Sequence, residues 1–434
     1  MASRALVRRS TSLAPRVVVL GGGFAGVSAA LELARAGGGA LPIHVTLLSD
    51  RNFFLFTPML AEAATGAVDT RHVCYPIRPL CGAHGVEFAE MKVESIDLER
   101  RRVVGRHHRS PVAQQVQFDH LVLALGATPN TSIAPGATEH AVPFKAVGDA
   151  IRIRNRVIDL FEAAALTDDP WARRRLLTFV VVGAGHAGTE LIAAIEELAR
   201  GVLPRHYPSL DPASVRLVLV GSSVLPQTAT NLAAYTREQL LRRGIELETR
   251  RAAKVTTEGL IVQDGTLIES ACVVWTAGTR VSPLVTELPL ARARDGRLLV
   301  NEFFETSASG IYALGDNAAQ TDVHTGQTYP ATAQVAVRQG KALAEQVVAR
   351  LTGQTPRPFR FRLLGEMVPL SRHTAVADLR GLKLVGFPAW SIWKTVYMLK
   401  LPTLSARLRV VLDWTVELFF ERDVSELSVD EEAA

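Results

Sequence analysis

Two glycine clusters are the residues of this chain best suited to chemistry, because both have the spacing that holds a phosphate group. The first cluster contains Gly21, Gly23 and Gly26, and the second contains Gly183, Gly185 and Gly188. In this spacing one glycine permits a tight turn, the next lets a pyrophosphate approach the backbone, and the last lets a helix pack closely on a strand. The helix N-terminus then faces the negative charge. Each cluster therefore predicts a dinucleotide site.

The segments around both clusters have the composition of a strand that turns into a helix. Residues 16–30 read RVVVLGGGFAGVSAA, and residues 178–192 read TFVVVGAGHAGTELI. A β-branched apolar run that ends in glycines and continues as a helical pattern is typical of a buried parallel strand in a Rossmann unit. Because the pattern occurs twice, we predict an α/β fold with two Rossmann-like domains, each of which binds one dinucleotide.

Other patterns extend this α/β prediction along the chain. Strand-like runs lie at 45–48, 92–97, 116–125, 215–220 and 271–275, and helical patterns cover 150–165, 229–243 and 331–351. Gly244 is suited to end the helix at 229–243. We predict a basic arm at 1–15, a first dinucleotide domain at 16–150 and 306–355, a second one inserted at 151–305, and a C-terminal region at 356–434.

The position that usually binds a dinucleotide ribose differs between the two units. Asp50 follows the second predicted strand of the first unit, whereas Gly221 occupies that place in the second unit. An acid there accepts hydrogen bonds from a 2′-hydroxyl and repels a 2′-phosphate. Its absence at Gly221 leaves both NADH and NADPH open as the second dinucleotide.

Composition excludes several other classes of protein. The chain has 48 basic and 43 acidic residues, a formal charge of +5, and no basic run interleaved with aromatics, which argues against nucleic-acid binding. Cys74, Cys81 and Cys272 form neither a C-x-x-C pair nor a ligand set with histidine, so we predict no metal site, no disulfide framework and a reducing compartment. The arm at 1–15 is basic and lacks the apolar run of a secretory signal, while a transit peptide stays open.

Eight stretches carry a resemblance to a known family: GGGFAG, SDRNFFLFTPML, FDHLVLALGATPN, VVGAGHAGTELIAAI, VVWTAG, GIYALGDNA, ATAQVAVRQG and AVADLRGLKLVGFPAW. Over nearly its whole length the chain resembles the type II, non-proton-pumping NADH:quinone dehydrogenases, which are flavoproteins with two dinucleotide-binding domains. The resemblance implies FAD as the resident cofactor, NADH (with NADPH possible) as the donor, and a membrane quinone as the acceptor.

The resemblance also assigns residues to the two dinucleotides. The FAD residues would be Gly21, Gly22, Gly23, Phe24, Ala25, Gly26, Asp50, Pro58, Gly126 and Asp316, and the nicotinamide dinucleotide residues would be Gly183, Gly185, Gly188 and Gly278. Pro58 would pass near the isoalloxazine, and Asp316 would bind the ribityl chain unless it is a simple turn residue. Glu190 would lie where nicotinamide meets flavin, although a glutamate at a helix start also suits the helix dipole.

On the acceptor side, the family pattern A-Q-x-A-x-Q-x-G is altered. Gln334 keeps the first glutamine, but Arg338 replaces the second one, which would change the polarity of a quinone pocket. Gln339 lies roughly 100° around the helix from Arg338 and is not expected to substitute for the missing amide. Lys383 matches a family lysine near the quinone and flavin, with extension into solvent as the alternative.

The C-terminal region has the composition of a membrane-surface element. Residues 388–400 and 404–421 combine tryptophans and basic residues with an apolar helical stripe. The stripe consists of Leu404, Leu408, Val411, Thr415, Leu418 and Phe419. These helices predict a peripheral enzyme on the cytoplasmic face of the cell membrane, or on an organellar inner membrane. Packing on the protein's own domain, or on a partner subunit in a homodimer, stays open.

Two other functions are compatible with the motifs. Arg338 and the small excess of basic over acidic residues would suit a soluble flavoprotein reductase that donates electrons to a ferredoxin-like protein. A redox-sensing protein that keeps FAD but turns over poorly is the third reading, and the intact glycine clusters argue against it.

Overall fold

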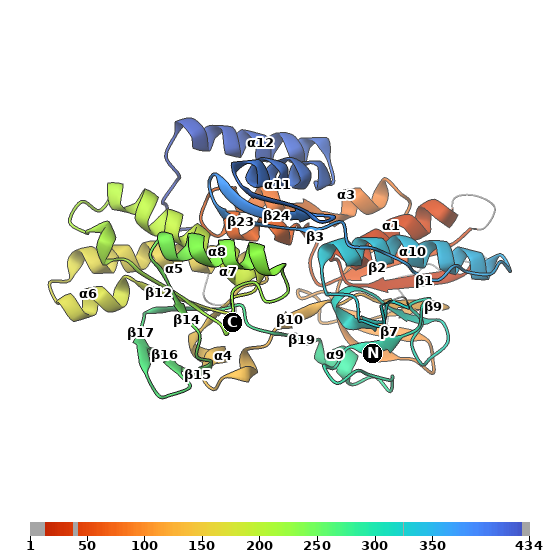
Figure 1. Ribbon diagram of the computed structural model, residues 1–434. Coiled ribbons are helices and arrows are strands. Elements are labelled where there is room, and N and C mark those ends of the chain that lie inside the picture. Colours follow the sequence, from red (N-terminus) through yellow and green to blue (C-terminus); the bar gives the residue numbers. More distant parts are fainter. Residues whose placement is uncertain (1–13, 38–41, 324, 428–434) are drawn as a thin grey trace. The chain divides into compact units, whose positions relative to one another are not determined.

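The computed structural model describes residues 14–37, 42–323 and 325–427 (Figure 1). Its chain divides into two compact units that each take segments from distant parts of the sequence. Unit 1 comprises 1–54, 76–128 and 280–363, and unit 2 comprises 55–75, 129–279 and 364–434. Most of the predicted basic arm, residues 1–13, lies outside the described residues. The domain limits taken from the sequence stay a prediction.

Unit 1 is built on a five-stranded sheet in the order β21-β9-β1-β2-β5. The strands are β1 (Arg16–Leu20), β2 (His44–Ser49), β5 (Glu87–Glu90), β9 (His120–Leu123) and β21 (Ile311–Ala313), and all neighbours pair in parallel. Val17 to Leu20 are at most 1% exposed. Both faces of a parallel sheet are covered, so the strand is a continuous apolar run rather than an alternating one.

Helices α1 (Phe24–Gly37) and α10 (Ala333–Leu351) of unit 1 pack directly against each other. A Cβ at Gly340 would lie 2.7 Å from the backbone nitrogen of Ala29, so only glycine permits this approach. The antiparallel strands β6 (Lys92–Asp97), β7 (Arg102–Arg106) and β8 (Gln114–Gln117) form a separate sheet. The run expected as one strand at 116–125 is therefore divided between β8 and β9.

Unit 2 repeats the arrangement with a sheet in the order β11-β18-β12-β13-β14. The strands are β11 (Val142–Pro143), β12 (Thr178–Val182), β13 (Arg216–Val220), β14 (Ile245–Glu248) and β18 (Cys272–Trp275), again all parallel. Its helices are α5 (Val147–Leu166), α7 (His186–Glu196) and α8 (Thr230–Arg242). Helices α5 and α8 agree with the helical patterns predicted at 150–165 and 229–243, and α7 follows the second glycine cluster as expected. Gly244 follows α8 with φ +68°, as expected for a helix end. The prediction of two Rossmann-like units is confirmed.

The C-terminal part of unit 2 contains a sheet that the sequence analysis did not predict. Strands β23 (Glu366–Ser371), β24 (Thr374–Leu379) and β25 (Leu382–Gly386) form an antiparallel meander, and α11 (Phe387–Lys400) and α12 (Leu404–Phe419) follow (Figure 1). Val368, Leu370 and Val376 are buried with Leu225 and Leu232 in one small core. Among the described residues, no helix is long and apolar enough to cross a membrane.

The remaining elements are short. They are β3 (Phe53–Leu55), α2 (Leu60–Ala63), β4 (Cys74–Pro76), α3 (Ile77–Gly82), β10 (Ala127–Pro129), α4 (Ala137–His140), α6 (Pro170–Leu176), β15 (Ala252–Thr256), β16 (Gly259–Val262), β17 (Leu267–Glu269), β19 (Thr279–Val281), α9 (Pro283–Thr286), β20 (Leu298–Val300) and β22 (Ala318–Gln320). Of these short elements, α2 packs on α7.

Candidate active site

The first glycine turn, between β1 and α1, cannot be built from other residues. Gly21 has φ +112°, and a Cβ there would lie 2.2 Å from the carbonyl oxygen of Ala124. A Cβ at Gly26 would lie 1.9 Å from the carbonyl oxygen of Gly21. A Cβ at Gly23, in contrast, would meet no described atom within 4 Å. The turn is thus locked at its ends and open at its centre, where a pyrophosphate would approach.

The residues around this turn present an N-terminus suited to an anion. Helix α1 begins at Phe24 and has no acidic residue in its first turn, so nothing opposes a phosphate there. Phe24 packs edge-to-face on Phe54, with ring centroids 4.8 Å apart. Ala25 is buried beneath the turn, while Gly22 lies against Ser49 at the end of β2. Asp50 is exposed directly after β2, at the strand end where a ribose would bind.

Other FAD candidates in unit 1 leave polar groups and space for a cofactor. Gly126 follows β9 with φ +71°, and a Cβ there would meet no described atom within 4 Å. Asp316 lies in the 3-10 turn Gly315–Asn317. The next residue, Asn317, is fully buried, and neither polar atom of its amide has a hydrogen-bond partner among the described residues. A buried amide without partners is costly, so these residues fit a polar cofactor such as FAD.

Gln339 holds this 3-10 turn in place, a role the sequence analysis missed. Its Oε1 accepts from the Gly315 N–H at 2.8 Å, and its Nε2 donates to Gln320 Oε1 at 3.0 Å. The side chain is only 2% exposed. Gln339 therefore points into the core of unit 1, which agrees with the expectation that it cannot replace the glutamine missing at position 338. Its closeness to Gly315 follows from tertiary packing and leaves no local signal in the sequence.

Replacing Gln339 by leucine should loosen FAD binding. The change leaves the Gly315 N–H and the Gln320 amide buried and unpaired, at a cost of about 1–3 kcal/mol for each group. We expect a lower FAD content after dialysis and a lower melting temperature. The matched control is Gln354→Leu, at an exposed position just beyond α10. Equal FAD retention by both variants would show that Gln339 does not support the cofactor turn.

The second glycine turn, between β12 and α7, has the same construction. Gly183 has φ +113°, and a Cβ there would lie 2.5 Å from Thr276 Oγ1. A Cβ at Gly188 would lie 1.8 Å from the Gly183 carbonyl oxygen. Thr276 Oγ1 is within 2.9 Å of the carbonyl oxygens of Val182 and Gly183 and can donate to either. Gly185 caps α7 without any side-chain hydrogen bond, so the helix N-terminus is open to a phosphate.

The structure gives a physical reason for the missing ribose acid of unit 2. A Cβ at Gly221 would lie 2.6 Å from the Cβ of Ala184 and 3.0 Å from its backbone nitrogen. The glycine turn thus lies too close to the end of β13 for a side chain at position 221. The turn at Gly278, with φ +69°, follows β18 in the same unit. Ribose recognition must come from other groups.

Glu190 lies in the first turns of α7 and has an unusual electrostatic environment. Burial, with a smaller contribution from the repulsion of Glu62, raises the pKa of Glu190 to about 8. The side chain is therefore largely protonated at neutral pH. Burial also raises the pKa of Tyr397, on α11, with a further contribution from Glu190. A carboxyl group with such a pKa can hold and release a proton near neutral pH.

The three acceptor candidates occupy two different units. In unit 1, Gln334 and Arg338 lie one turn apart on α10; Gln334 is partly buried, and the exposed Arg338 guanidinium lies 5.8 Å from the ring centre of Phe361. In unit 2, Lys383 is exposed on β25, and its Nζ donates to Asn231 Oδ1 at 2.8 Å. Pro58 also belongs to unit 2, in the 3-10 turn Thr57–Met59.

The cysteines are unsuited to redox chemistry. All three are free. Burial raises the pKa of the Cys81 thiol to about 11 and that of the Cys272 thiol to about 12, so neither forms a thiolate at neutral pH. These two buried thiols therefore lack the thiolate character that disulfide exchange requires.

Comparisons with known proteins fit this geometry. Residues 15–340 match the family described as pyridine nucleotide-disulphide oxidoreductase, and residues 364–423 match the NDH2 C-terminal domain. The type II NADH:quinone oxidoreductase of Mycobacterium tuberculosis is 31% identical, over 94% of this chain and 89% of that protein. The chain belongs to the type II NADH:quinone oxidoreductase family.

A second relative and a solved structure are also similar to this chain. The demethylphylloquinone reductase of a Synechocystis species is 30% identical, over 93% of this chain and 96% of that protein. The structure of NDH2 from Plasmodium falciparum in complex with NADH has the same fold, with a TM-score of 0.86 at 18% identity over 95% of this chain and 99% of that one. The β23–β25 sheet and helices α11 and α12 all lie within the stretch that matches the type II C-terminal domain.

Proposed function

We propose that this protein is a FAD-dependent oxidoreductase that takes a hydride from NADH and passes two electrons to a membrane quinone without pumping protons. The proposal rests on the match of the C-terminal residues to the NDH2 C-terminal domain, in a chain that also contains two glycine turns suited to dinucleotides. Bound FAD would accept the hydride and hand on the electrons in pairs. NADPH is a possible second donor because no acid occupies position 221.

The residues of the chain supply binding, orientation and a proton in this scheme. The turns at Gly21–Gly26 and Gly183–Gly188 hold the pyrophosphates against helix N-termini. Asp316 and Gly126 would position the flavin, and Glu190 would offer a protonated carboxyl group at the nicotinamide contact. Arg338 and Gln334 would line the approach of the quinone, and Lys383 would add positive charge near it.

Membrane attachment through α12 is part of the proposal. The helix exposes one continuous apolar face, in which Leu404, Leu412 and Phe419 are 70%, 61% and 78% exposed. Its other face is bound to the protein: Ala406 and Val410 are buried, and Asp413 Oδ2 lies 2.6 Å from His72 Nδ1. Packing of α12 on the protein's own domain therefore leaves its apolar stripe exposed. An exposed apolar face flanked by tryptophan and basic side chains suits a lipid surface, which is where a lipid-soluble quinone would be found.

A protein acceptor is the second candidate, motivated by the exposed Arg338. The ferredoxin reductase of the CYP199A2 system from Rhodopseudomonas palustris shares the fold, with a TM-score of 0.66 over 84% of this chain. The type II C-terminal domain favours the quinone. The test is NADH oxidation by FAD-loaded protein with a short-chain quinone or with a [2Fe–2S] ferredoxin. We expect the quinone to accelerate the reaction; acceleration by ferredoxin alone would reverse the choice of acceptor.

Restoring the family glutamine should alter quinone use. In Arg338→Gln the cation and its contact with Phe361 are lost, a contact of the kind that contributes about 0.5–1 kcal/mol at exposed sites. We expect the KM for quinone to fall roughly twofold to fivefold, the change that an energy of this size produces, with the KM for NADH unchanged. Lys341→Gln, at another exposed position of α10, serves as the control. An unchanged quinone KM would place the acceptor pocket elsewhere.

A further inference from the structure

Glu62, on α2 in unit 2, is a partly buried acid that the scheme above does not use. Its Oε2 is shielded from solvent and has no hydrogen-bond partner among the described residues. Burying a carboxylate without partners costs several kcal/mol, and such a group usually keeps a proton instead. An acid at this position, where α2 packs on α7, is therefore expected to have a function.

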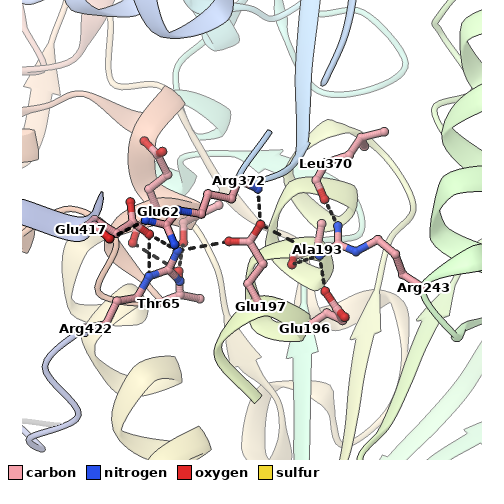
Figure 2. Close-up of polar contacts among 11 residues, drawn as sticks. Glu62, Thr65, Ala193, Glu196, Glu197, Arg243, Leu370, Arg372, Glu417 and Arg422 are labelled. Atoms are coloured by element: carbon pink, nitrogen blue, oxygen red, sulfur yellow. Dashed lines mark hydrogen bonds and ion pairs between the residues drawn. The ribbon is translucent and has the colours of Figure 1, made fainter. Parts of the chain in front are cut away.

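The charged neighbours of Glu62 are already engaged with one another. Arg422 binds Glu417 and donates to Glu197 Oε2 at 3.1 Å (Figure 2). The Arg372 guanidinium donates to the backbone carbonyl of Glu417, and the Arg372 backbone N–H donates to the Glu197 carboxylate. Figure 2 shows Glu62 beside this group with no dashed line from its own carboxylate. Glu197 and Glu417 thus have fixed cationic partners, whereas Glu62 has none within hydrogen-bond distance.

The other elements packed near α2 present few further charges. From α5, the buried Arg154 donates to the backbone carbonyl of Asp423. From the 3-10 turn Thr70–Val73, His72 is bound to Asp413. Both side chains therefore bond to groups other than Glu62.

Two charged residues that act on Glu62, Lys394 and Glu417, line a pocket that opens to solvent. This pocket has a volume of about 190 Å³ and is lined by Lys394 and Glu417, together with His373 and the rings of Trp390 and Trp414. The Lys394 Nζ lies 4.7 Å from the ring centre of Trp390 and 4.2 Å from that of Trp414. Lys394 also attracts the Glu62 carboxylate. The pocket can thus bring water and a titratable amine toward Glu62.

Glu190 is a second acid near Glu62, because the helix that carries it, α7, packs on α2. The two carboxyl groups are close enough for Glu62 to raise the pKa of Glu190, and burial raises the pKa of Glu62 itself to about 7. Repulsion from Glu417 and Glu197 opposes the attraction of Lys394 and Arg422 at Glu62. Each of the two acids can therefore gain and lose a proton near neutral pH. The pair titrates as a coupled unit.

We propose that Glu62 is a relay residue that carries a proton from the Lys394 pocket to Glu190 during each turnover. The inference rests on the proposed function, whose overall reaction is NADH + H⁺ + quinone → NAD⁺ + quinol. The hydride supplies two electrons and one hydrogen, and the second hydrogen must come from water. Glu190 gives its proton to the quinone as the quinone is reduced, and Glu62 then reprotonates the Glu190 carboxylate. A solvent proton that enters through the pocket reprotonates Glu62, so one proton is consumed for each quinol and only O–H bonds form and break at these acids.

The test is Glu62→Gln in the FAD-loaded enzyme, with a short-chain quinone as acceptor. The amide keeps the shape of the side chain but cannot release a proton. We expect kcat to fall about tenfold to hundredfold, at the lower end of what proton transfer by a placed side chain contributes. Anaerobic hydride transfer from NADH to the flavin should keep its wild-type rate, because that step consumes no proton from the relay.

The pH profile separates a relay from a structural role. The kcat of the wild-type enzyme should fall as pH rises above the pKa values of the pair, because both acids then lack the proton to be donated. Glu62→Gln should flatten this limb and increase the solvent deuterium isotope effect, and Glu62→Asp should restore part of the rate. Glu238→Gln, at an exposed position of α8, is the control.

Two results would overturn the relay. One is a wild-type kcat and pH profile in Glu62→Gln. The other is an equal slowing of hydride transfer and quinone reduction with loss of FAD, which would show that Glu62 only supports the fold. Failure of the wild-type enzyme itself to reduce any quinone would instead refute the proposed function. The wild-type reaction with the short-chain quinone, run beside the variants, shows this separately.

Discussion

Replacing Gly188 by valine should abolish NADH oxidation while leaving FAD bound. The added Cβ would lie 1.8 Å from the Gly183 carbonyl oxygen and 2.6 Å from Thr276 Oγ1, so the turn that receives the pyrophosphate must open. We expect kcat/KM for NADH to fall more than about hundredfold, equivalent to about 3 kcal/mol of binding in the transition state. The FAD residues Gly21–Gly26 and Asp316 belong to unit 1 and should be unaffected.

The matched control is Gly201→Ala, in the π-helical turn that continues α7. A Cβ at Gly201 would meet no described atom within 4 Å, and its φ is not in the left-handed region. The measurements are steady-state NADH kinetics and the flavin absorbance of the purified variants. Near-normal NADH kinetics in Gly188→Val would show that this turn does not bind the donor. Loss of flavin from the same variant would show that the two dinucleotide sites are not independent.

Charging the exposed face of α12 should release the protein from membranes. Leu408, Leu412 and Phe419 are each more than half exposed, and glutamate at all three positions would place three charges where the lipid contact is proposed. Burial of one such side chain contributes about 1.5–3 kcal/mol when complete. The triple variant should therefore bind vesicles more than about hundredfold less tightly, even if the side chains insert only partly.

Vesicle co-sedimentation of the triple variant measures this effect. The control carries the same three charges at exposed positions outside α12, as Gln327→Glu, Gln354→Glu and Thr355→Glu. Short-chain quinone activity should be retained in both variants, since the face carries no residue assigned to the site. Unchanged vesicle binding together with a change from dimer to monomer would assign the face to a second copy of the chain instead of lipid.

The local parts of the fold and site could be predicted from the sequence. A strand, three glycines and a helix are adjacent in the chain, so the turns at Gly21–Gly26 and Gly183–Gly188 follow from steric rules that act over a few residues. The same is true of the α12 stripe, because helical periodicity decides which side chains share a face. Its exposure required the structure, since Val410 and Asp413 show which face packs on the protein.

The parts that were missed depend on contacts between distant residues. Gln339 was considered only for its register on α10, and its bonds to the Gly315 turn arise from tertiary packing. Glu62 and Glu190 lie far apart in the sequence, so their coupling appears only when α2 packs on α7. The loss of the ribose acid at Gly221 was visible in the sequence, but its cause, the close approach of Ala184, was not.

The β23–β25 sheet was missed for a different reason. Its strands are five or six residues long, no shorter than β1, but the pattern of β24 does not alternate. Ala375, Val376 and Ala377 are all buried in succession. The left-handed Arg380, with φ 55°, and Gly381 mark the turn between β24 and β25. Turn residues of this kind are the local signal that a hairpin leaves in a sequence.

The most direct test of the central claim is anaerobic sequential mixing of the FAD-loaded protein. NADH is mixed first, and a short-chain quinone second, while the flavin absorbance is followed. The account predicts rapid loss of that absorbance on the first mixing and its full recovery on the second, with one quinol formed for each NADH consumed. Loss of absorbance with no recovery when quinone is added would contradict the account.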